Sequence, residues 1–474
     1  MTTPWASPRV IRALAALLTG VLLASCGGGG GGGDGSFSGG GPCSISAQKT
    51  WVRNVTNEWY LFPDLLPSQV NLSDYADAAS LLDAMTAQAR AEGKDRFFSF
   101  LTTQQADNSF LQEGEFIGFG FRLIIRGTQV FFLDVYESSP AADAGLTRGG
   151  ELLAVDSGSG FVSVAQLLQQ DPNLANAFGP SDEGVTRGLR FAEVPTGTVL
   201  ERSLTKRVVT IQPIPDGGTR ILTLPTGPDG PEVKVGYLLL RTFISSAETP
   251  LRQAFTEFRA QGVQNLILDF RYNGGGLLSV AALLGDLLGA LRSSSDLYFR
   301  LQFRNSKSGN NESVFFRPLP ESVDAVSIAF ITTGASASAS ELTVNSMDSW
   351  ANVGMVGADT FGKPVGQSAF DLQGCDNRLR LVTFRAVNRD GEGDYYNGLA
   401  GTLPGAFCPA DDQLERVPGD PLETSTATAL SWLSLGSCPA PTSSTLGQKL
   451  EPTVERLPAP ERPSVAQWHL PGLF

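Results

Sequence analysis

The amino-acid sequence predicts a multi-domain α/β protein. Two short apolar runs, 266–270 and 327–333, are each followed by a turn of small residues and then by a helical pattern. This alternation is typical of a parallel sheet covered by helices. A helical stretch and a β-rich stretch precede this core, and a chain of 474 residues is long enough for two to four domains.

The first 26 residues predict export. Arg9 and Arg12 precede an apolar run that begins at Ala13. The run is too short for a membrane span and indicates a signal peptide, 1–26. Its end, Leu-Ala-Ser-Cys, resembles a bacterial lipoprotein signal, which implies cleavage before Cys26 and lipidation of that cysteine. An ordinary secretory signal is the alternative.

The lipoprotein resemblance also implies a location. Gly27 rather than Asp follows the cysteine, and by analogy with the sorting rule of such lipoproteins this favours the outer membrane, facing the periplasm. Residues 27–42 are mostly glycine with some serine, so we expect a flexible linker between the anchor and the folded chain.

Composition agrees with an exported protein. The formal net charge of −13 implies no nucleic-acid partner. Four cysteines remain after the anchor, and an even number in an oxidising compartment predicts two disulfides, with three possible pairings. We expect Cys375–Cys408, because both flank a probable hairpin, which leaves Cys43–Cys438. Four free buried thiols are the alternative.

Residues 43–112 predict a small helical domain. Large apolar residues recur at helical spacing between Trp51 and Tyr60, and the stretch from Ala78 to Ala91 is rich in alanine and leucine. We interpret the aromatic residues as core rather than as a cofactor site.

Residues 113–214 are β-rich and contain the glycine-aromatic run Gly118, Phe119, Gly120 and Phe121. Together with the segment 139–155, this run resembles a PDZ domain of the circularly permuted bacterial kind. The resemblance implies that the run captures a peptide C-terminus, with backbone N–H groups on the carboxylate and the peptide added to the sheet as a strand.

Two features depart from that PDZ pattern. Gly150 stands where the family has Asp, and residues 157–188 are longer than a compact PDZ domain requires. A structural β module without a ligand is the alternative.

Residues 215–438 form the expected core. A strand at 235–240 and a helix at 249–260 lead to the strand 266–270, and a glycine turn then opens the helix 277–291. Such a helix start favours anions. A dinucleotide site is rejected, because three consecutive glycines do not match Gly-x-Gly-x-x-Gly.

Ser338 is the candidate nucleophile. It lies on the turn between the strand 327–333 and a helix, where a side chain stands exposed beside unpaired helical N–H groups. A nucleophile with an oxyanion site needs this arrangement. The alternative is a capping box, in which Ser338 and Glu341 only satisfy the start of the helix.

Lys363 is the candidate base. The chain has a single histidine, His469, which argues against a Ser-His-Asp triad and against a histidine zinc site. A lysine acting as base near neutral pH needs a pKa of about 7 to 8 instead of about 10.4, which burial without a carboxylate partner can supply. The nearby Gly-x4-Gly-Lys is no P-loop, because Pro364 stands where Ser or Thr must bind magnesium.

The spacing of these residues resembles the C-terminal processing (tail-specific) peptidases of the S41 type. Ser-Ala-Ser-Ala-Ser-Glu is followed by Phe-Gly-Lys and, four residues later, by glutamine. The resemblance implies Ser338 as nucleophile, Lys363 as general base and Gln367 as the residue that orients the lysine. The run 269–276 matches the family's Asp-Leu-Arg-x-Asn-x-Gly-Gly, which implies an oxyanion hole. Its donors would be the N–H of Ala339 with that of Gly275 or Gly276.

The same resemblance implies a ClpP/crotonase-like ββα core with a PDZ-like module and a helical N-terminal domain. It implies no cofactor and no metal, and substrates that are proteins or peptides with free C-termini. The proline-rich tail 439–474 is expected to be unstructured. Two alternatives stay open: a lipid-anchored PDZ-type adaptor with an inactive core, and a crotonase-like thioester enzyme, which export from the coenzyme A pool disfavours. The sequence leaves the oligomeric state open.

Overall fold

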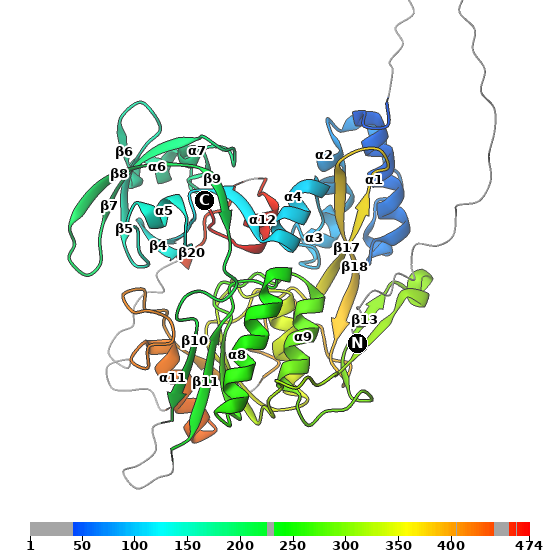
Figure 1. Cartoon of the computed structure of the whole chain (residues 1–474). Helices are drawn as coiled ribbons and strands as arrows, with labels where there is room; N and C mark the ends of the chain where they lie inside the picture. Colours follow the sequence, from blue (N-terminus) through cyan, green and yellow to red (C-terminus); the bar gives the residue numbers. More distant parts are fainter. Residues whose placement is uncertain (1–40, 225–231, 404, 440–454, 461) are drawn as a thin grey trace, which may run out of the picture. The chain divides into compact units, whose positions relative to one another are not determined.

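The structure is a computed structural model that describes residues 41–224, 232–403, 405–439, 455–460 and 462–474. The expected signal peptide, its lipidation site Cys26 and most of the glycine-rich linker lie outside the described residues. The described residues of the unit Gly41–Phe474 form sheets of five, six and seven strands and a two-stranded ribbon (Figure 1). Each helix in the described ranges is too short or too polar to cross a bilayer.

A six-stranded sheet forms the core, in the order β10-β11-β12-β15-β16-β19. Its strands are β10 (Thr219–Thr223), β11 (Lys234–Leu239), β12 (Asn265–Asp269), β15 (Ser327–Thr332), β16 (Asn352–Gly357) and β19 (Phe407–Pro409). β11 to β19 run parallel, and β10 pairs antiparallel with β11. The expected strands 235–240, 266–270 and 327–333 are confirmed as β11, β12 and β15.

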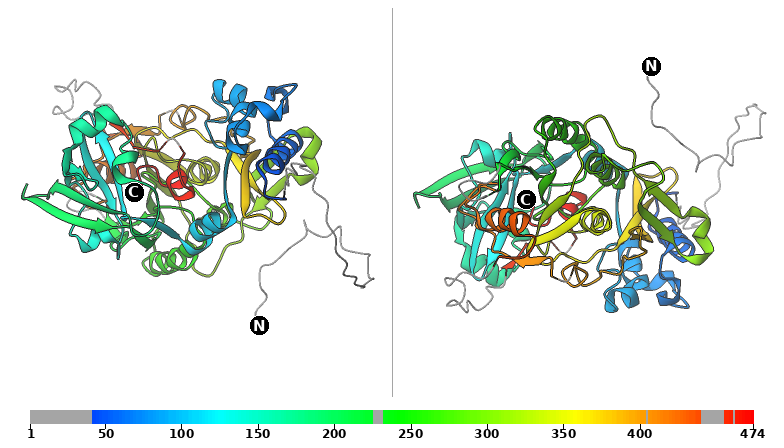
Figure 2. Two further views of the ribbon diagram at one scale, coloured as in Figure 1. Left: turned by 90° about the horizontal axis from the view of Figure 1, so that it is seen from above. Right: turned by 90° about the horizontal axis from the view of Figure 1, so that it is seen from below.

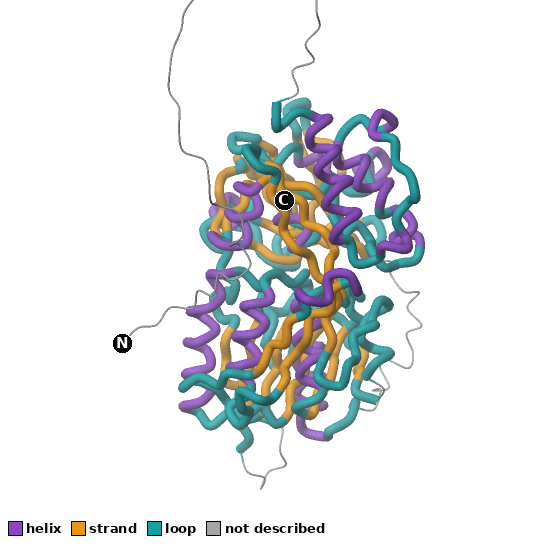
Figure 3. The backbone as a smooth tube through the Cα atoms, turned by 90° about the vertical axis from the view of Figure 1, so that its right-hand side faces the viewer, coloured by secondary structure: helices purple, strands orange, loops and turns teal. Residues whose placement is uncertain are grey.

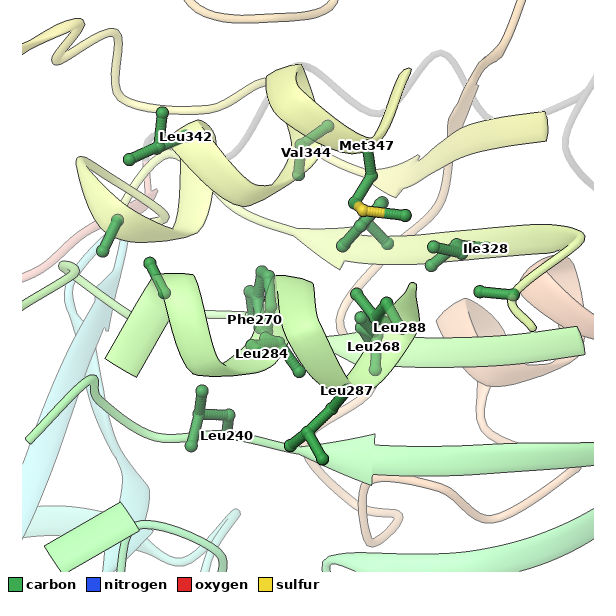
Figure 4. Packing of buried hydrophobic residues seen from close by; sticks show 14 of the residues in the cluster. Leu240, Leu268, Phe270, Leu284, Leu287, Leu288, Ile328, Leu342, Val344 and Met347 are labelled. Atoms are coloured by element: carbon green, nitrogen blue, oxygen red, sulfur yellow. The ribbon is translucent and has the colours of Figure 1, made fainter. Parts of the chain in front are cut away.

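Helices cover both faces of this sheet (Figure 3). They are α8 (Glu248–Ala260), α9 (Leu278–Leu288), α10 (Ala339–Asp348) and α11 (Thr424–Leu435). α8, α9 and α10 pack on one face, where Leu268 and Ile328 point toward Leu284 and Met347 (Figure 4). α11 covers the opposite face with Trp432. The two-sided burial explains why the strands are continuously apolar.

Three loops meet at the edge where β12, β15 and β16 end. The Ala337 N–H donates to the Asn273 carbonyl at 3.0 Å, which joins the loop after β15 to the loop after β12. The Phe361 N–H donates to the Ser336 carbonyl at 2.9 Å, which joins the loop after β16 to the same turn. The carboxyl edge of a parallel sheet is where such loops gather functional residues.

A five-stranded sheet connects the N-terminal helices to the core. Its strands are β1 (Phe100–Thr103), β13 (Leu297–Phe303), β14 (Glu312–Phe315), β17 (Val365–Asp371) and β18 (Asn377–Val387). The helices that pack on the β17–β18 hairpin are α1 (Ile45–Trp59), α2 (Ala78–Met85) and α3 (Ala87–Ala91). The expected helices of this region are therefore present, and β1 from the same region joins the sheet through β18.

Six strands of the seven-stranded sheet, together with the two-stranded ribbon, form what we call the β module, residues 115–210. Its strands are β2 (Glu115–Gly118), β3 (Phe121–Arg126), β4 (Gln129–Val135), β5 (Glu151–Asp156), β6 (Phe161–Ser163), β7 (Thr186–Ala192), β8 (Val199–Thr205) and β9 (Arg207–Thr210). Its helices are α5 (Pro140–Asp143), α6 (Val164–Gln170) and α7 (Ala175–Phe178). The long stretch 157–188 supplies β6, α6 and α7, which cover the sheet.

Short elements complete the described chain. They are η1 (Pro63–Leu65), η2 (Leu72–Asp74), α4 (Gln104–Asn108), η3 (Ser109–Glu113), η4 (Ser245–Ala247) and η5 (Asn305–Asn310).

The expectation of an unstructured tail is wrong for residues 455–474, with residue 461 left out of the description. This segment forms β20 (Glu455–Arg456), which pairs with β3, and α12 (Val465–His469) (Figures 1 and 2, red). The physical reason is burial: Leu470, Leu473 and Phe474 are each at most 5% exposed. We call residues 462–474 the tail segment.

The described part of the chain contains two disulfides, as expected, but the expected pairing is wrong. The bonds are Cys43–Cys375 and Cys408–Cys438. The hairpin near Cys375 is β17–β18, whose turn carries this cysteine next to the start of α1. Cys408 lies in β19 rather than in a loop, and α11 ends close to it.

Candidate active site

Ser338 lies at the N-terminus of α10, directly after the small-residue turn that follows β15. Its backbone has φ 56° and ψ −113°, a region that a residue with a side chain rarely adopts. Such a conformation costs about 1–3 kcal/mol and persists only where surrounding contacts impose it. The residues on either side, Ala337 and Ala339, are buried, while Ser338 is partly exposed.

The contacts that impose this conformation come from the glycine turn after β12. The Asn273 carbonyl accepts from the Ala337 N–H and from the Ser340 hydroxyl, at 3.0 and 2.9 Å. The Ser336 hydroxyl donates to the Phe270 carbonyl at 2.7 Å. The hydroxyls of Ser336 and Ser340 therefore connect the loop after β15 to the loop after β12.

Lys363 lies in the loop between β16 and β17 and is partly buried. Burial lowers the pKa of its amine to about 8, and the nearby Asp95 and Glu341 carboxylates oppose that shift only in part. Among the described residues, no carboxylate forms an ion pair with Lys363. Its Nζ lies 5.1 Å from the centre of the Phe98 ring. A large fraction of the amine is therefore neutral at mildly alkaline pH.

Glu341 joins the Ser338 turn to the Lys363 loop. Its Oε2 accepts from the Ser338 N–H at 2.9 Å and from the Lys363 N–H at 2.8 Å, and its Oε1 accepts from the Gly362 N–H at 2.6 Å. The side chain is fully buried, and burial raises the pKa of its carboxyl above the ordinary value although these hydrogen bonds oppose the shift. One oxygen atom thus holds the backbones of the candidate nucleophile and base side by side.

The sequence indicated Glu341 only as a capping residue. The capping interaction with the Ser338 N–H exists, and the same carboxylate also holds the 362–363 backbone. A glutamate three residues after the serine was the available signal, but nothing in the sequence links it to a loop more than twenty residues later.

Gln367 lies on β17 and lines the same cavity as Lys363. Its Nε2 donates to the Phe98 carbonyl at 2.7 Å. Because the Phe98 ring also contacts the Lys363 amine, Phe98 lies between the two residues. Phe98 precedes β1 in the N-terminal region, and no local sequence pattern indicates its contact with these residues.

The glycine turn lies directly against the nucleophile. A Cβ built on Gly275 would lie 2.8 Å from the Ser338 Cβ and 2.9 Å from the Ala339 nitrogen. In this structure the Gly275 N–H donates to the Asn273 Oδ1 at 2.9 Å. Gly276 is a neighbour of Phe243, with which it forms an isolated β-bridge. Of the two expected glycine donors, Gly275 is therefore the one adjacent to Ser338 and Ala339.

A buried network of ion pairs stabilises the glycine turn after β12. The Arg271 guanidinium pairs with the carboxylates of Asp269, Asp412 and Glu423. Tyr272 also donates its hydroxyl to Asp412, and Arg148 pairs with the same carboxylate. These charges hold the pKa of Asp412 well below its ordinary range. Breaking such a network would leave a buried charge without a partner, which is strongly unfavourable. The network therefore holds the turn in one conformation.

A cavity of about 1190 Å³ opens beside these groups. Its lining includes Ala337, Gly274, Lys363 and Gln367, together with Trp468 and His469 of the tail segment. A space of this size accommodates several residues of an extended peptide. The described residues contain no cluster of His, Cys, Asp or Glu that could hold a metal ion.

The lone histidine lies in this cavity and not in a free tail. His469 stacks on Phe110 with ring centres 5.2 Å apart, and its carbonyl oxygen accepts from the Gly274 N–H at 3.2 Å. Burial, together with the charge of Lys363, lowers the pKa of the His469 imidazole to about 3.

The glycine-aromatic run of the β module is also occupied. The N–H groups of Phe119, Gly120 and Phe121 converge on the carbonyl oxygen of Phe474, at 3.1, 3.0 and 3.4 Å. Gly118 lies beside them, because a Cβ built on it would be 3.1 Å from the Phe474 carbonyl carbon.

Two segments of the chain match known protein families. Residues 234–400 match peptidase family S41, and residues 47–100 match the peptidase S41 N-terminal domain. The core of this chain is a peptidase family S41 domain. The match to the S41 domain includes Ser338, Lys363, Gln367 and the glycine turn.

Two similar proteins are named as C-terminal processing proteases. The chain is 28% identical over 263 residues to a carboxyl-terminal-processing protease of Synechocystis, covering 55% of this chain and 56% of that protein. It is 30% identical over 261 residues to a chloroplastic C-terminal processing peptidase of Tetradesmus obliquus, covering 52% and 50%. The chain thus spans about half the length of the curated relatives it matches.

A solved structure shares the fold. A protein of Bacteroides fragilis assigned to the S41 proteases superposes with a TM-score of 0.62 at 21% identity, covering 81% of this chain and 97% of that one. The S41 fold therefore extends well beyond the 234–400 domain.

Proposed function

We propose that this S41 chain is a serine endopeptidase that uses Ser338 as nucleophile and Lys363 as general base. The observation that carries the proposal is Glu341. Its one carboxylate oxygen accepts from the backbone N–H groups of both residues, and burial gives the lysine amine a pKa of about 8. A base with a pKa near the working pH is the most effective one.

The proposed reaction is acyl transfer. The neutral Lys363 amine takes the Ser338 hydroxyl proton as Oγ attacks a peptide carbonyl, and the protonated amine then gives that proton to the leaving nitrogen. Water hydrolyses the acyl-enzyme with the same lysine as base. Gln367 acts as a positioning residue, since its contact with Phe98 fixes the wall against which the lysine lies.

The proposed oxyanion site consists of the N–H groups of Ala339 and Gly275. The tight contact between Gly275 and the Ser338–Ala339 backbone supports it. The Gly275 N–H, which donates to the Asn273 side chain here, would be shared with the oxyanion during the reaction. Removing one such donor typically costs about 10²–10³ in rate.

We further propose that the β module is PDZ-like and binds the ends of substrate polypeptides through Gly118, Phe119, Gly120 and Phe121. The location that fits the sequence is the bacterial envelope, with a lipid anchor at Cys26. Unfolded or C-terminally presented proteins are then the substrates.

Cleavage of a disordered protein, followed on gels, tests the peptidase proposal. The wild-type chain is expected to degrade the substrate, whereas Ser338→Ala and Lys363→Ala are expected to leave it intact while keeping the wild-type thermal unfolding curve. Wild-type turnover by either variant would overturn the assignment.

Two observations favour a second candidate, a lipid-anchored peptide-binding adaptor with an inactive core. The Gly275 N–H donates to the Asn273 side chain, and the tail segment forms part of the cavity wall. Peptide binding without cleavage by the wild-type chain would support the adaptor.

A further inference from the structure

The tail segment of this chain lines the cavity that contains Lys363 and Gln367, and it pairs with the β module. It contacts the β module at one end and the cavity beside Ser338 and Lys363 at the other.

At the β module, the last three residues form an additional strand beside β3. The Leu123 N–H donates to the Gly472 carbonyl at 2.8 Å, and the Phe474 N–H donates to the Phe121 carbonyl at 3.0 Å. Arg122 and Leu473 form an antiparallel bridge between these bonds. Addition of a strand to a sheet edge is a general way to bind an extended peptide.

The end of this strand has a dedicated site. Three N–H groups from Phe119 to Phe121 point at the Phe474 carbonyl oxygen. Gly120 has φ 86°, and a Cβ there would lie 2.1 Å from the Ser139 Cβ, so only glycine allows the loop to close in this way. Such a set of N–H groups suits an oxygen that carries negative charge.

The side chain of Phe474 fills an aromatic pocket. Its ring centre lies 4.5 Å from that of Phe178 and 6.4 Å from that of Phe121, and the residue is 5% exposed. A small or charged side chain would leave this pocket empty or bury an unpaired charge. The pocket therefore selects a large apolar residue at this position.

A buried arginine links the bound strand to the active-site turn. Arg122 is 2% exposed. Its Nε and one terminal nitrogen donate to the Pro471 carbonyl, at 3.0 and 2.9 Å, and the same terminal nitrogen donates to the Tyr272 carbonyl at 2.9 Å. Tyr272 directly precedes Asn273, which holds the Ser338 turn.

At the cavity, the tail backbone already presents a peptide carbonyl to the glycine turn. The His469 carbonyl accepts from the Gly274 N–H, and a Cβ on Gly274 would lie 2.3 Å from that oxygen. The neighbouring Trp468 stacks on Phe100 with ring centres 5.2 Å apart. A substrate backbone cannot use this surface while the tail occupies it.

We propose that residues 465–474 are an intramolecular ligand of the β module and of the active-site groove. The module then recognises polypeptides whose last residue is phenylalanine or another large apolar residue, and such polypeptides must displace the tail segment. The competition part rests on the proposed peptidase function, whereas the binding part does not.

Fluorescence anisotropy with a labelled peptide, Val-Ala-Gln-Trp-His-Leu-Pro-Gly-Leu-Phe, tests the binding part in the full-length Ser338→Ala protein. The added variant Phe474→Asp removes the internal competitor. It is expected to bind the peptide about ten-fold or more tightly than the Ser338→Ala parent, since a tethered ligand competes at an effective concentration near millimolar. The same peptide ending in Asp is expected to bind at least about ten-fold more weakly. Equal binding to both proteins, or binding indifferent to the last residue, would overturn the proposal.

A second variant, with residues 463–474 deleted, tests the proposal independently in case Phe474→Asp does not fold. If the deletion variant unfolds with the parent's cooperativity, or regains that cooperativity when the peptide is added, the segment is a ligand. If it stays unfolded with saturating peptide, the segment is a structural strand and the proposal is wrong. With Ser338 restored, the deletion is expected to raise kcat/KM for a disordered substrate several-fold. Peptide binding without any cleavage would refute the peptidase proposal and leave the binding site intact.

Discussion

Lys363 is placed where its positive charge is disfavoured. Burial lowers the pKa of its amine to about 8, and the carboxylates of Asp95 and Glu341 are too distant to form ion pairs with it. The protonated form cannot accept the Ser338 proton, so activity requires the neutral form.

The pH dependence of cleavage follows from this assignment. Below about 8 most of the amine is protonated and inactive, and above about 8 most is neutral, so kcat/KM is expected to rise with pH and level off above the pKa. A pH–rate profile of the full-length chain between pH 6 and 10 measures this. A profile that falls between pH 6 and 8 would contradict a lysine base.

Glu341 is expected to be needed for peptide cleavage, as Ser338 and Lys363 are. In Glu341→Gln an amide NH₂ replaces one carboxylate oxygen, so at least one of the N–H groups of Ser338, Gly362 and Lys363 loses its acceptor. An unsatisfied buried donor costs about 1–3 kcal/mol. Loss of these hydrogen bonds would displace Lys363 relative to Ser338, so kcat/KM should fall by about 100-fold or more.

Chemical denaturation and cleavage assays measure both effects of Glu341→Gln. Glu257→Gln is a matched control, because Glu257 is an exposed glutamate on α8 far from these loops in sequence. Equal activity of the two variants would show that Glu341 does not position the site.

At the scale of elements, the turn after β12 and the start of α10 act as one unit. Gly275→Ala would place a methyl group 2.8 Å from the Ser338 Cβ, in a backbone with φ 100° that alanine disfavours. We expect a loss of kcat/KM of about 100-fold or more, since the oxyanion donors would separate.

Gly334→Ala is the control for this substitution. Gly334 lies on the neighbouring turn, and a Cβ there meets no atom within 4 Å. Its activity is expected to stay within about two-fold of wild type, because an exposed substitution without new contacts changes little. Comparable losses in both variants would mean that the turn tolerates no change at all, and the specific contact with Ser338 would lose its support.

The disulfides fix elements that are distant in sequence. Peptide mapping under non-reducing conditions is expected to recover Cys43 with Cys375 and Cys408 with Cys438. Replacing Cys408 and Cys438 together by serine should lower the free energy of unfolding by about 2–4 kcal/mol, because the 408–438 loop is then no longer closed in the unfolded chain. Recovery of a Cys375–Cys408 peptide would contradict the structure.

At the scale of the whole molecule, local patterns predicted the core well. The strands 266–270 and 327–333 and the glycine turn follow from runs of apolar and small residues that are contiguous in sequence. Their convergence also follows, because the ends of neighbouring parallel strands share one edge. Residue type made Ser338 and Lys363 candidates, and the resemblance to the S41 peptidases favoured them over the capping alternative.

Long-range contacts were not predictable in the same way. Cys43 and Cys375 are 332 residues apart, and the sequence does not indicate which cysteines meet. The proline spacing of 439–474 suggested an open chain, yet Phe474 finds its partners in a pocket formed by Phe121 and Phe178. Neither the Cys43–Cys375 bond nor the burial of Phe474 is indicated by a pattern among residues close together in the sequence.

In the proposed mechanism of the whole molecule, Ser338 becomes acylated with the help of a neutral Lys363. Acid quenching during turnover of a peptide substrate, followed by mass spectrometry of the digested protein, tests it directly. The account predicts an acyl adduct on the peptide that contains Ser338, absent from Ser338→Ala and from Lys363→Met. Cleavage that continues in Lys363→Met, or an adduct on another residue, would contradict it.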